Sequence, residues 1–310
     1  MSAVELSAVA LVGTLTGVHA ASWGAFKDTP FEGFRVGKFL RSVALGLTSA
    51  YAVHHFLGVT DLFVLVGLAY CAERLATEWW KAILREDHQG GYTIPMRLAV
   101  RGRPIDSRLT RYAVGLGILA GLLGVLALAA ANREHLANLP AWQLVALAGV
   151  GGWLTAFGGA WKDAPIEGFE TLKFFRSPVV ATAWASALVP FTTDLPVLAI
   201  AAAGWSVITI ETYKTFLDGG VPGKFGDKPA RHPAQRVRRT CRALHCGLYA
   251  ALTGGLALTV FAATLPGVEA DPGQVRAELQ VLLLSCGYAF VLLTTGGARR
   301  PAPGQLQEFG

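Results

Sequence analysis

Charged residues are scarce in this chain. Lys, Arg, Asp and Glu together make up 15% of its 310 residues, whereas hydrophobic residues make up 53%. Because soluble globular domains usually carry about 25% charged residues, this composition excludes an ordinary water-soluble domain. We therefore expect an all-α polytopic membrane protein, with membrane lipids among its partners.

Cysteines are few, and the motifs of common enzyme classes are missing. Cys71, Cys241, Cys246 and Cys286 fall in or beside apolar segments without any C-x-x-C pair, so we interpret them as small buried hydrophobic residues. No G-x-S-x-G or H-E-x-x-H motif occurs. Residues 221–225 read VPGKF, but no Ser or Thr follows the Gly-Lys pair, which excludes a P-loop.

Long apolar runs dominate what is present. A membrane-spanning helix needs roughly 20 mostly apolar residues, and the chain offers about nine such segments. The second and the sixth are short, so each is either tilted, half-buried or continuous with the preceding helix. The candidate spans are 3–25, 42–58, 60–80, 112–131, 141–161, 178–192, 194–213, 244–265 and 277–297.

Basic residues are concentrated in alternate loops between these spans. Of the 27 Lys and Arg residues, only Arg74, Arg133 and Arg276 lie elsewhere. The positive-inside rule makes the basic side cytoplasmic. We therefore expect an integral protein of the cell (inner) membrane, with its N-terminus outside and its C-terminus in the cytoplasm. The net charge of +6 then reflects topology and anionic lipid headgroups, and gives no reason to expect nucleic acid as a partner.

One charged segment occurs twice. Residues 27–42 read KDTPFEGFRVGKFLRS and residues 162–177 read KDAPIEGFETLKFFRS, with ten of sixteen positions identical. We call them the first motif and the second motif. A shorter match follows in each half, where TEWWK at 77–81 corresponds to IETYK at 210–214. Such self-similarity at a fixed offset indicates an internal duplication.

The duplication predicts how the chain is organised. Each copy contains four spans, an even number, so both copies should share one orientation and be related by a pseudo-two-fold axis along the membrane normal. We expect membrane repeat A at 1–134, membrane repeat B at 135–270, and an extra C-terminal transmembrane helix with a tail at 271–310. The predicted fold class is thus two tandem four-helix repeats in parallel orientation plus one C-terminal helix, about nine transmembrane helices in all.

A purely structural interpretation covers part of the repeated residues. In the first motif, Pro30 fits the first turn of a helix, and Thr29 with Glu32 fits a capping box at a helix start. The cations that recur at helical spacing fit anchors that reach lipid phosphates. Glu78 and Lys81, three residues apart, fit a local ion pair.

The presence of the same charges in both copies favours a site at the cytoplasmic face. There, cations would bind phosphate oxygens, and carboxylates would hold a metal ion, Mg²⁺ being the candidate, or act as a base. The predicted catalytic and metal-ligating residues are Asp28, Asp163, Glu32 and Glu167. The predicted substrate-binding residues are Lys27, Lys162, Lys38, Lys173, Arg41, Arg176, Glu78, Lys81, Glu211 and Lys214.

Three function classes are compatible with such a site. The first is an integral membrane enzyme that acts on a phosphate-bearing lipid or polyprenol at the cytoplasmic face. The second is a transporter or channel for an anionic solute or lipid along the pseudo-two-fold axis. The third is a noncatalytic membrane scaffold. The duplicated charges stop at the inner interface, which favours the enzyme, whereas their presence in both copies favours a symmetric transport site. His19, His54 and His55, which lie in spans, are not duplicated.

Overall fold

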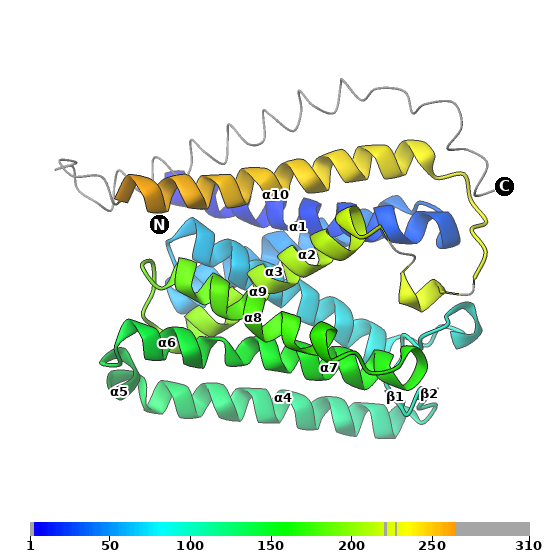
Figure 1. Ribbon diagram of the computed structural model, residues 1–310, viewed down its shortest axis with the longest axis horizontal. Coiled ribbons are helices and arrows are strands. Elements are labelled where there is room, and N and C mark those ends of the chain that lie inside the picture. The colour runs from blue at the N-terminus through cyan, green and yellow to red at the C-terminus, as the bar shows by residue number, and fades with distance from the viewer. Residues whose placement is uncertain (1–2, 220–221, 227, 264–310) are drawn as a thin grey trace.

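The protein is an all-α chain in the computed structural model, which describes residues 3–219, 222–226 and 228–263. Two strands of two residues each, β1 (Ala99–Val100) and β2 (Arg103–Pro104), pair as an antiparallel hairpin. Figure 1 shows the helices side by side along the long axis of the molecule. The predicted helix and tail at 271–310 lie outside the described residues, as does Cys286. The helices are α1 (Ala3–Glu32), α2 (Val36–Leu57), α3 (Leu62–Trp79), α4 (Arg108–Ala131), α5 (Arg133–Ala137), α6 (Ala141–Ala148), α7 (Val150–Glu167), α8 (Thr171–Leu188), α9 (Leu195–Thr212) and α10 (Gln235–Ala263), with π-helical turns η1 (Trp80–Leu84) and η3 (Tyr213–Leu217) and 3-10 turns η2 (Gln89–Gly91) and η4 (Gly223–Phe225).

Several helices are long and apolar enough to cross a membrane. Five segments meet this condition on their own: Glu5–Glu32, Arg108–Ala131, Ala141–Glu167, Leu195–Leu217 and Gln235–Val260. A sixth candidate is α2 together with α3 and η1, which are bent by 119° relative to each other. A membrane protein built from helices is therefore supported, whereas the described residues do not establish nine spans.

Matching local signals set the bounds of the two central helices. α3 begins after Asp61, whose Oδ1 accepts hydrogen bonds from the N–H groups of Phe63 and Val64, each at 3.0 Å. α9 begins after Asp194, which accepts from the N–H of Val197 at 3.3 Å. Such N-caps satisfy donors that the first helical turn leaves without a partner. Both helices end in a five-residue π-helical turn, η1 and η3.

The first motif lies at a helix end, so the predicted helix start is wrong. α1 ends at Glu32 with Pro30 inside its last turn. The predicted capping box is not formed, because the Thr29 hydroxyl donates to the carbonyl of Ala25 at 2.6 Å. The helix ends here because Gly33 has a φ of 75°, a left-handed conformation that glycine adopts without strain.

The second motif repeats this helix end. α7 ends at Glu167, again with a proline, Pro165, inside its last turn. Gly168 follows with a φ of 87° and donates its N–H to the carbonyl of Ala164 at 3.0 Å. The same local sequence therefore produces the same backbone geometry in both places.

The helices on either side of each motif pack closely together. A Cβ atom added at Gly17 of α1 would lie 2.5 Å from Cα of Val43 in α2. One added at Gly152 of α7 would likewise lie 2.5 Å from Cα of Pro178 in α8. Since the opposing atoms belong to the backbone, no side chain can move aside, and glycine is required at both crossings.

The centre of the bundle is the contact between α3 and α9. Trp205 of α9 is fully buried and donates its indole N–H to the carbonyl of Phe63 in α3 at 2.9 Å. Gly67 of α3 lies against Gly204 of α9. α10 packs along α1, whereas α4 lies at the edge of the bundle with only 6% of its apolar stretch buried. The described cysteines, all free thiols, are Cys71, Cys241 and Cys246.

Candidate anion-binding site

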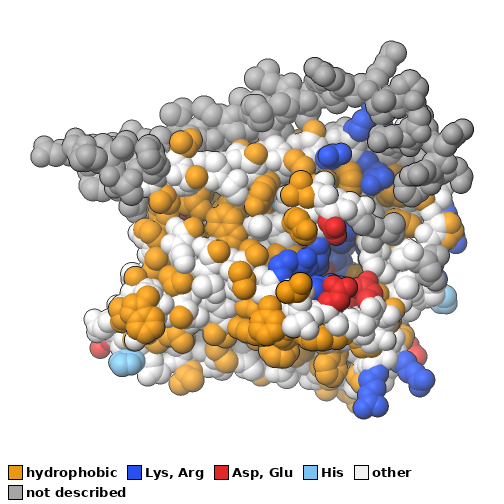
Figure 2. Space-filling model, viewed as in Figure 1, with side chains coloured by type: hydrophobic (Ala, Val, Ile, Leu, Met, Phe, Trp, Pro, Cys, Tyr) orange, Lys and Arg blue, Asp and Glu red, His pale blue; other side chains and the backbone are white. Residues whose placement is uncertain are grey.

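Both motifs lie at one end of the bundle. α1, α3, α7 and α9 run toward this end, and α2, α4, α8 and α10 begin there, on the right of Figure 1. Figure 2 shows basic side chains with acidic ones beside them on this half of the visible face, whereas hydrophobic side chains prevail on the other half. The chain direction thus delivers both motifs and both Glu-x-x-Lys segments to the same place.

Two lysines hold the aspartate of the first motif. Lys38 Nζ lies 2.9 Å from Asp28 Oδ2 and 2.6 Å from Glu32 Oε2, so one ammonium group serves two carboxylates. Lys224, which follows α9 in the second half of the chain, lies 2.6 Å from Asp28 Oδ1. Asp28 is buried, with 8% of its surface exposed. Its carboxylate is therefore neutralised by cations from both halves of the chain.

Loops from both halves also cover this motif. Tyr92, in the loop between α3 and α4, donates its hydroxyl hydrogen to Glu32 Oε1 at 3.3 Å. Burial, together with the negative charge of Glu32, raises the pKa of Tyr92. Phe225, next to Lys224, stacks on Phe31 with ring centroids 4.3 Å apart. Aromatic packing thus holds the lysine loop against the end of α1.

The second motif has the same Lys-Glu pair but no counterpart of Lys224 on its aspartate among the described residues. Lys173 Nζ lies 2.7 Å from Glu167 Oε2. Burial disfavours the charge on Lys173, but the hydrogen bond to Glu167 and the negative charges of Glu167, Asp163 and Glu170 together outweigh burial and raise the pKa of the lysine. Asp163, the counterpart of Asp28, forms no ion pair within 4.0 Å among the described residues. Its carboxylate is only partly buried.

The short turn η4 touches both motifs. Its first residue, Gly223, lies with its backbone against the carboxylate of Glu167 in the second motif. Its second residue, Lys224, forms the ion pair with Asp28 in the first motif. The two motifs are therefore neighbours in space, although 135 residues separate them in the chain.

The lysines that begin the motifs, Lys27 and Lys162, have no ion-pair partner in the described part of the chain. Lys27 Nζ lies 3.7 Å from the ring centre of Trp23, a cation–π contact. Lys162 lies within electrostatic range of Glu78, and Lys27 within range of Glu211. Each lysine thus faces the glutamate of the other half. Both lysines are half-buried, and the contact of Lys162 Nζ with Met96 Sδ at 3.8 Å still leaves hydrogen-bond donors unused.

Each Glu-x-x-Lys segment forms an ion pair within itself. Glu78 Oε1 lies 2.7 Å from Lys81 Nζ, and the corresponding Glu211 Oε1 lies 3.6 Å from Lys214 Nζ. Arg74, one turn earlier in α3, adds a contact of 3.4 Å to Glu78. Both lysines lie in π-helical turns, which often mark functional positions in helices.

A buried arginine anchors the loop that carries Tyr92. Arg111, with no exposed surface, donates to the carbonyls of Ile83 at 3.2 Å and Ile105 at 3.1 Å, and pairs with Glu86. These contacts join η1, the β-hairpin and the start of α4. The covering loop is thus fixed to the same π-helical turn that contributes Lys81.

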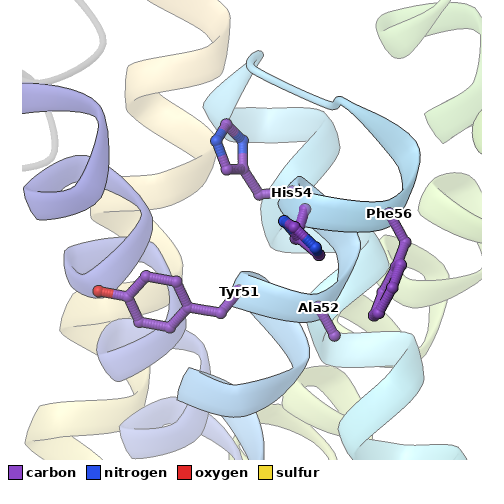
Figure 3. Close-up of a pocket in the computed structure, with 5 residues that line it drawn as sticks. Tyr51, Ala52, His54 and Phe56 are labelled. Atoms are coloured by element: carbon purple, nitrogen blue, oxygen red, sulfur yellow. The ribbon is translucent and has the colours of Figure 1, made fainter. Parts of the chain in front are cut away.

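A separate hollow at the other end of α2 is not part of this site. It encloses about 330 Å³ and is lined by Tyr51, Ala52, His54, His55 and Phe56, all from a single helix. Figure 3 shows Tyr51 and Phe56 on opposite sides of that helix. No residue of either motif reaches it, and His54 Nδ1 is already 2.8 Å from the carbonyl of Val59.

The structure connects most of the predicted site residues and leaves two apart. Arg41 is exposed on α2, and Arg176 has a buried Nε without a hydrogen-bond partner. Neither forms an ion pair in the described ranges. The predicted residues that ion pairs or electrostatic range join to one another are Lys27, Asp28, Glu32, Lys38, Glu78, Lys81, Lys162, Asp163, Glu167, Lys173, Glu211 and Lys214.

Sequence reasoning missed two cations of the cluster. Lys224 lies in a loop whose similarity to the first half is weak, so no periodic pattern singles it out. Arg74 was counted only as the cation that breaks the loop pattern. A charged residue inside a predicted span is itself a signal of function or of a specific partner, and that signal could have identified Arg74.

The carboxylates predicted to bind metal are mostly held by lysines. Asp28, Glu32 and Glu167 form ion pairs, and no group of three or more His, Cys, Asp or Glu residues that could hold a metal ion occurs in the described ranges. The magnesium site stays a prediction, and we derive no chemical step through it.

No protein-family model, curated protein or solved structure matches this chain. The function is therefore inferred from the geometry and chemistry of the site.

Proposed function

We propose that the protein is an integral membrane enzyme that acts on a phosphate-bearing lipid or polyprenol at the cytoplasmic face. The observation that carries this proposal is the pair Lys27 and Lys162. A half-buried cation without an ion pair is costly, because burial removes part of the water that would solvate it. A phosphate group between the two lysines would supply the missing negative charge through charge-assisted hydrogen bonds.

The proposal includes the duplicated architecture of about nine spans in two parallel repeats. The corresponding bounds of α3 and α9, their N-caps and their π-helical ends support it, as do the glycine contacts at Gly17 and Gly152. A two-fold relation would place Lys27 and Lys162 on opposite sides of one axis. A single phosphate on that axis could contact both.

Placing the site at the cytoplasmic face follows from the distribution of basic residues. The loops at the motif end contain most of the Lys and Arg residues, and the positive-inside rule assigns such loops to the cytoplasm. The N-terminus would then be outside and the C-terminus in the cytoplasm of an inner-membrane protein. A lipid could reach the lysines laterally from the inner leaflet.

Within this site we assign different roles to the two aspartates. Asp28 is occupied by Lys38 and Lys224, so its role is to hold the cluster together. Asp163 has no ion-pair partner in the described part of the chain and lies within electrostatic range of Lys162. It is the carboxylate that can accept a proton from a nucleophile next to a bound phosphate.

A transporter or channel for an anionic solute or lipid is the second candidate. Polar side chains inside the bundle favour it, because His19 and His245 are buried midway along α1 and in α10, where a purely interfacial enzyme does not require them. A noncatalytic scaffold is the third candidate and would use the lysines only to hold lipid headgroups.

The proposal can be tested with the full-length protein purified in detergent micelles. We expect mass spectrometry to find phosphate-bearing lipids that copurify, and we expect the wild type to cleave or transfer such a lipid phosphate. Lys27→Met and Lys162→Met should each weaken retention of the lipid about tenfold, the loss of one charge-assisted hydrogen bond. Arg239→Met, which removes an exposed cation at the same end, is the matched control.

The outcomes separate the three candidates. Turnover in micelles, where no compartments exist, supports the enzyme. Lipid or anion flux in proteoliposomes without turnover in micelles supports the transporter. Lysine-dependent retention without either supports the scaffold. If Lys27→Met and Lys162→Met retain lipid phosphate as the control does, the assigned site is wrong.

A further inference from the structure

A second group of polar side chains lies deeper in the bundle, away from the motifs. All its members are buried, and they come from four helices that pack together in the core. Four of them lie inside α1, α3 and α10, and Thr212 is the last residue of α9. None of them belongs to the first or the second motif, but Thr212 lies in the IETYK segment at 210–214. The group consists of Thr16 and His19 of α1, Tyr70 of α3, Thr212 of α9 and His245 of α10.

Two histidines form the centre of this group. The rings of His19 and His245 are 3.7 Å apart between centroids and inclined by 31°. Both ring nitrogens of His19 are buried without a hydrogen-bond partner, and so is the hydroxyl of Thr16 one turn earlier. Buried polar atoms in native proteins nearly always have a partner, so unpartnered atoms of this kind require an explanation.

The hydrogen bonds around His245 allow two protonation states. Its Nδ1 is 3.1 Å from the carbonyl oxygen of His19, which can only accept, so Nδ1 carries a hydrogen. Its Nε2 is 2.8 Å from Thr212 Oγ1. That hydroxyl is also 2.7 Å from the carbonyl of Ile208. A hydroxyl has one hydrogen, so it can donate to only one of these two neighbours.

Each choice fixes the charge of His245. If Thr212 donates to Ile208, its oxygen must accept from an Nε2–H group, and His245 is a cation with two N–H donors. If Thr212 donates to Nε2, His245 is neutral. The two states need the same heavy-atom positions and differ by rotation of one hydroxyl. His19 cannot be charged at the same time, because two imidazolium rings in contact repel each other strongly in a low-dielectric interior.

We propose that His19 and His245 form a binding site for a single proton inside the membrane-embedded bundle, with Thr212 as the hydroxyl that adjusts to its presence. The proton is held on one ring of the pair, and the unpartnered nitrogens of His19 are the route by which it enters or leaves. This site is independent of the phosphate site in its residues. Glu211 connects the proton site to the phosphate site, because it lies next to Thr212 and within electrostatic range of both His245 and Lys27.

The surroundings of the pair contain few other ionisable groups. Tyr70 lies edge-on to His19 with centroids 5.7 Å apart, and the ring of Phe216 packs on His245 at 4.6 Å. α2, which packs on α1, carries no ionisable side chain between Arg41 and Tyr51. The titratable groups that face the pair from α3 and α9 are Tyr70 and Glu211, and Glu73 and Arg74 lie within electrostatic range of Tyr70.

The experiment is a titration of the full-length protein in lipid nanodiscs. Its histidine rings are labelled with ¹⁵N, and NMR follows their protonation from about pH 4 to about pH 9, a range that brackets ordinary histidines. His19→Gln and His245→Gln assign the signals. We expect the pair to take up one proton in total. His55→Gln removes an exposed histidine on α2 and serves as the control, because it should leave the pair unchanged.

Substitutions at Thr212 test the hydroxyl separately from the fold. Thr212→Val keeps the shape but removes the acceptor for Nε2–H, so the proton affinity of the pair should fall about tenfold, one pH unit in the midpoint. Thr212→Ser keeps a hydroxyl and should titrate like the wild type. Uptake of two protons or of none by the pair would overturn the proposal, as would equal midpoints for the Val and Ser variants. Loss of lipid phosphate binding without a change in the histidine titration would count against the proposed function and in favour of an independent proton site.

Discussion

The first and second motifs have nearly the same sequence but different surroundings. Both end a helix at a glycine with positive φ, and both place a lysine on the glutamate six residues earlier, at 2.6 and 2.7 Å. Lys224 pairs with the aspartate of the first motif, whereas Asp163 of the second forms no ion pair among the described residues. Local sequence therefore fixes local geometry, while the rest of the fold decides which carboxylate is available to a ligand.

The difference arises from the helices and loops outside the motifs. α10 packs along α1, and the loop that precedes α10 brings Lys224 to Asp28. α4, which holds the corresponding place in the first half, lies at the edge of the bundle and leaves α7 less covered. The two copies thus differ in their neighbours: Asp28 pairs with Lys38 and Lys224, whereas Asp163 forms no ion pair among the described residues.

The largest expected effect is the loss of folding when the glycine at either helix crossing is replaced. Gly17→Leu and Gly152→Leu should each prevent folding, because a side chain at either position would overlap the backbone of the facing helix. We expect the amount of monodisperse protein after size-exclusion chromatography to fall for both to the same extent. Gly24→Ala and Gly158→Ala, where an added Cβ meets no atom within 4 Å, are the controls. A folded Gly152→Leu variant would show that the second crossing is looser than the first.

The next largest effect is a loss of stability on removing the motif lysine, and it should differ between the two halves. Lys38→Met removes the cation shared by Asp28 and Glu32, and should lower the free energy of unfolding by roughly 1 to 3 kcal/mol, since a buried carboxylate loses a partner. Lys173→Met breaks one half-exposed pair and should cost about 0 to 1 kcal/mol. Thermal unfolding in a mild detergent measures both. Equal losses would contradict the view that the first motif is the structural one.

The two aspartates should separate stability from activity. Asp28→Asn leaves Lys224 without its carboxylate and Lys38 with Glu32 alone, and should lower the free energy of unfolding by about 2 kcal/mol. Asp163→Asn should change stability by less than about 0.5 kcal/mol but abolish turnover of the lipid phosphate. Each variant is scored for the unfolding midpoint and for product formation. Full activity of Asp163→Asn would remove this residue from the proposed chemistry.

The smallest expected effect is that of single cysteine substitutions, whose labelling tests whether the two halves share one orientation. In a variant without native cysteines, single cysteines at Asp87 and Asp218 should both be protected from an impermeant thiol reagent added outside sealed cells. Cysteines at Asn132 and Thr193, at the opposite end of the bundle, should both be labelled. Different labelling of Asp87 and Asp218 would mean that the two halves do not have parallel orientations.

Sequence patterns predicted the positions of the helices better than their ends. Apolar runs locate α4 and α9, because hydrophobicity is the condition for a span. The sequence predicted a helix start at the motif, where the structure has a helix end, because a proline and nearby acidic residues fit a first turn as well as a last one. Only the φ of Gly33 distinguishes the two, and backbone geometry of this kind is not visible in composition.

The site was predicted where residues repeat and missed where they do not. Repetition singled out Lys27, Asp28 and their counterparts, and the even number of expected spans placed both sets at one end. It could not reveal Lys224, whose contact with Asp28 joins residues almost 200 positions apart. It gave no weight to His245 either, since a histidine pair between α1 and α10 is created by packing alone.

The ion pair between Asp28 and Lys224 has a consequence for selectivity. Asp28 is an internal competitor that already occupies one lysine of the site at 2.6 Å. An incoming anion gains that lysine only if it attracts the ammonium group more strongly than a carboxylate does. A doubly charged phosphate meets this condition, whereas chloride or a fatty-acid carboxylate does not. If the proposed phosphate site extends to Lys224, it would therefore favour ligands of high charge density over abundant weak anions at the membrane surface.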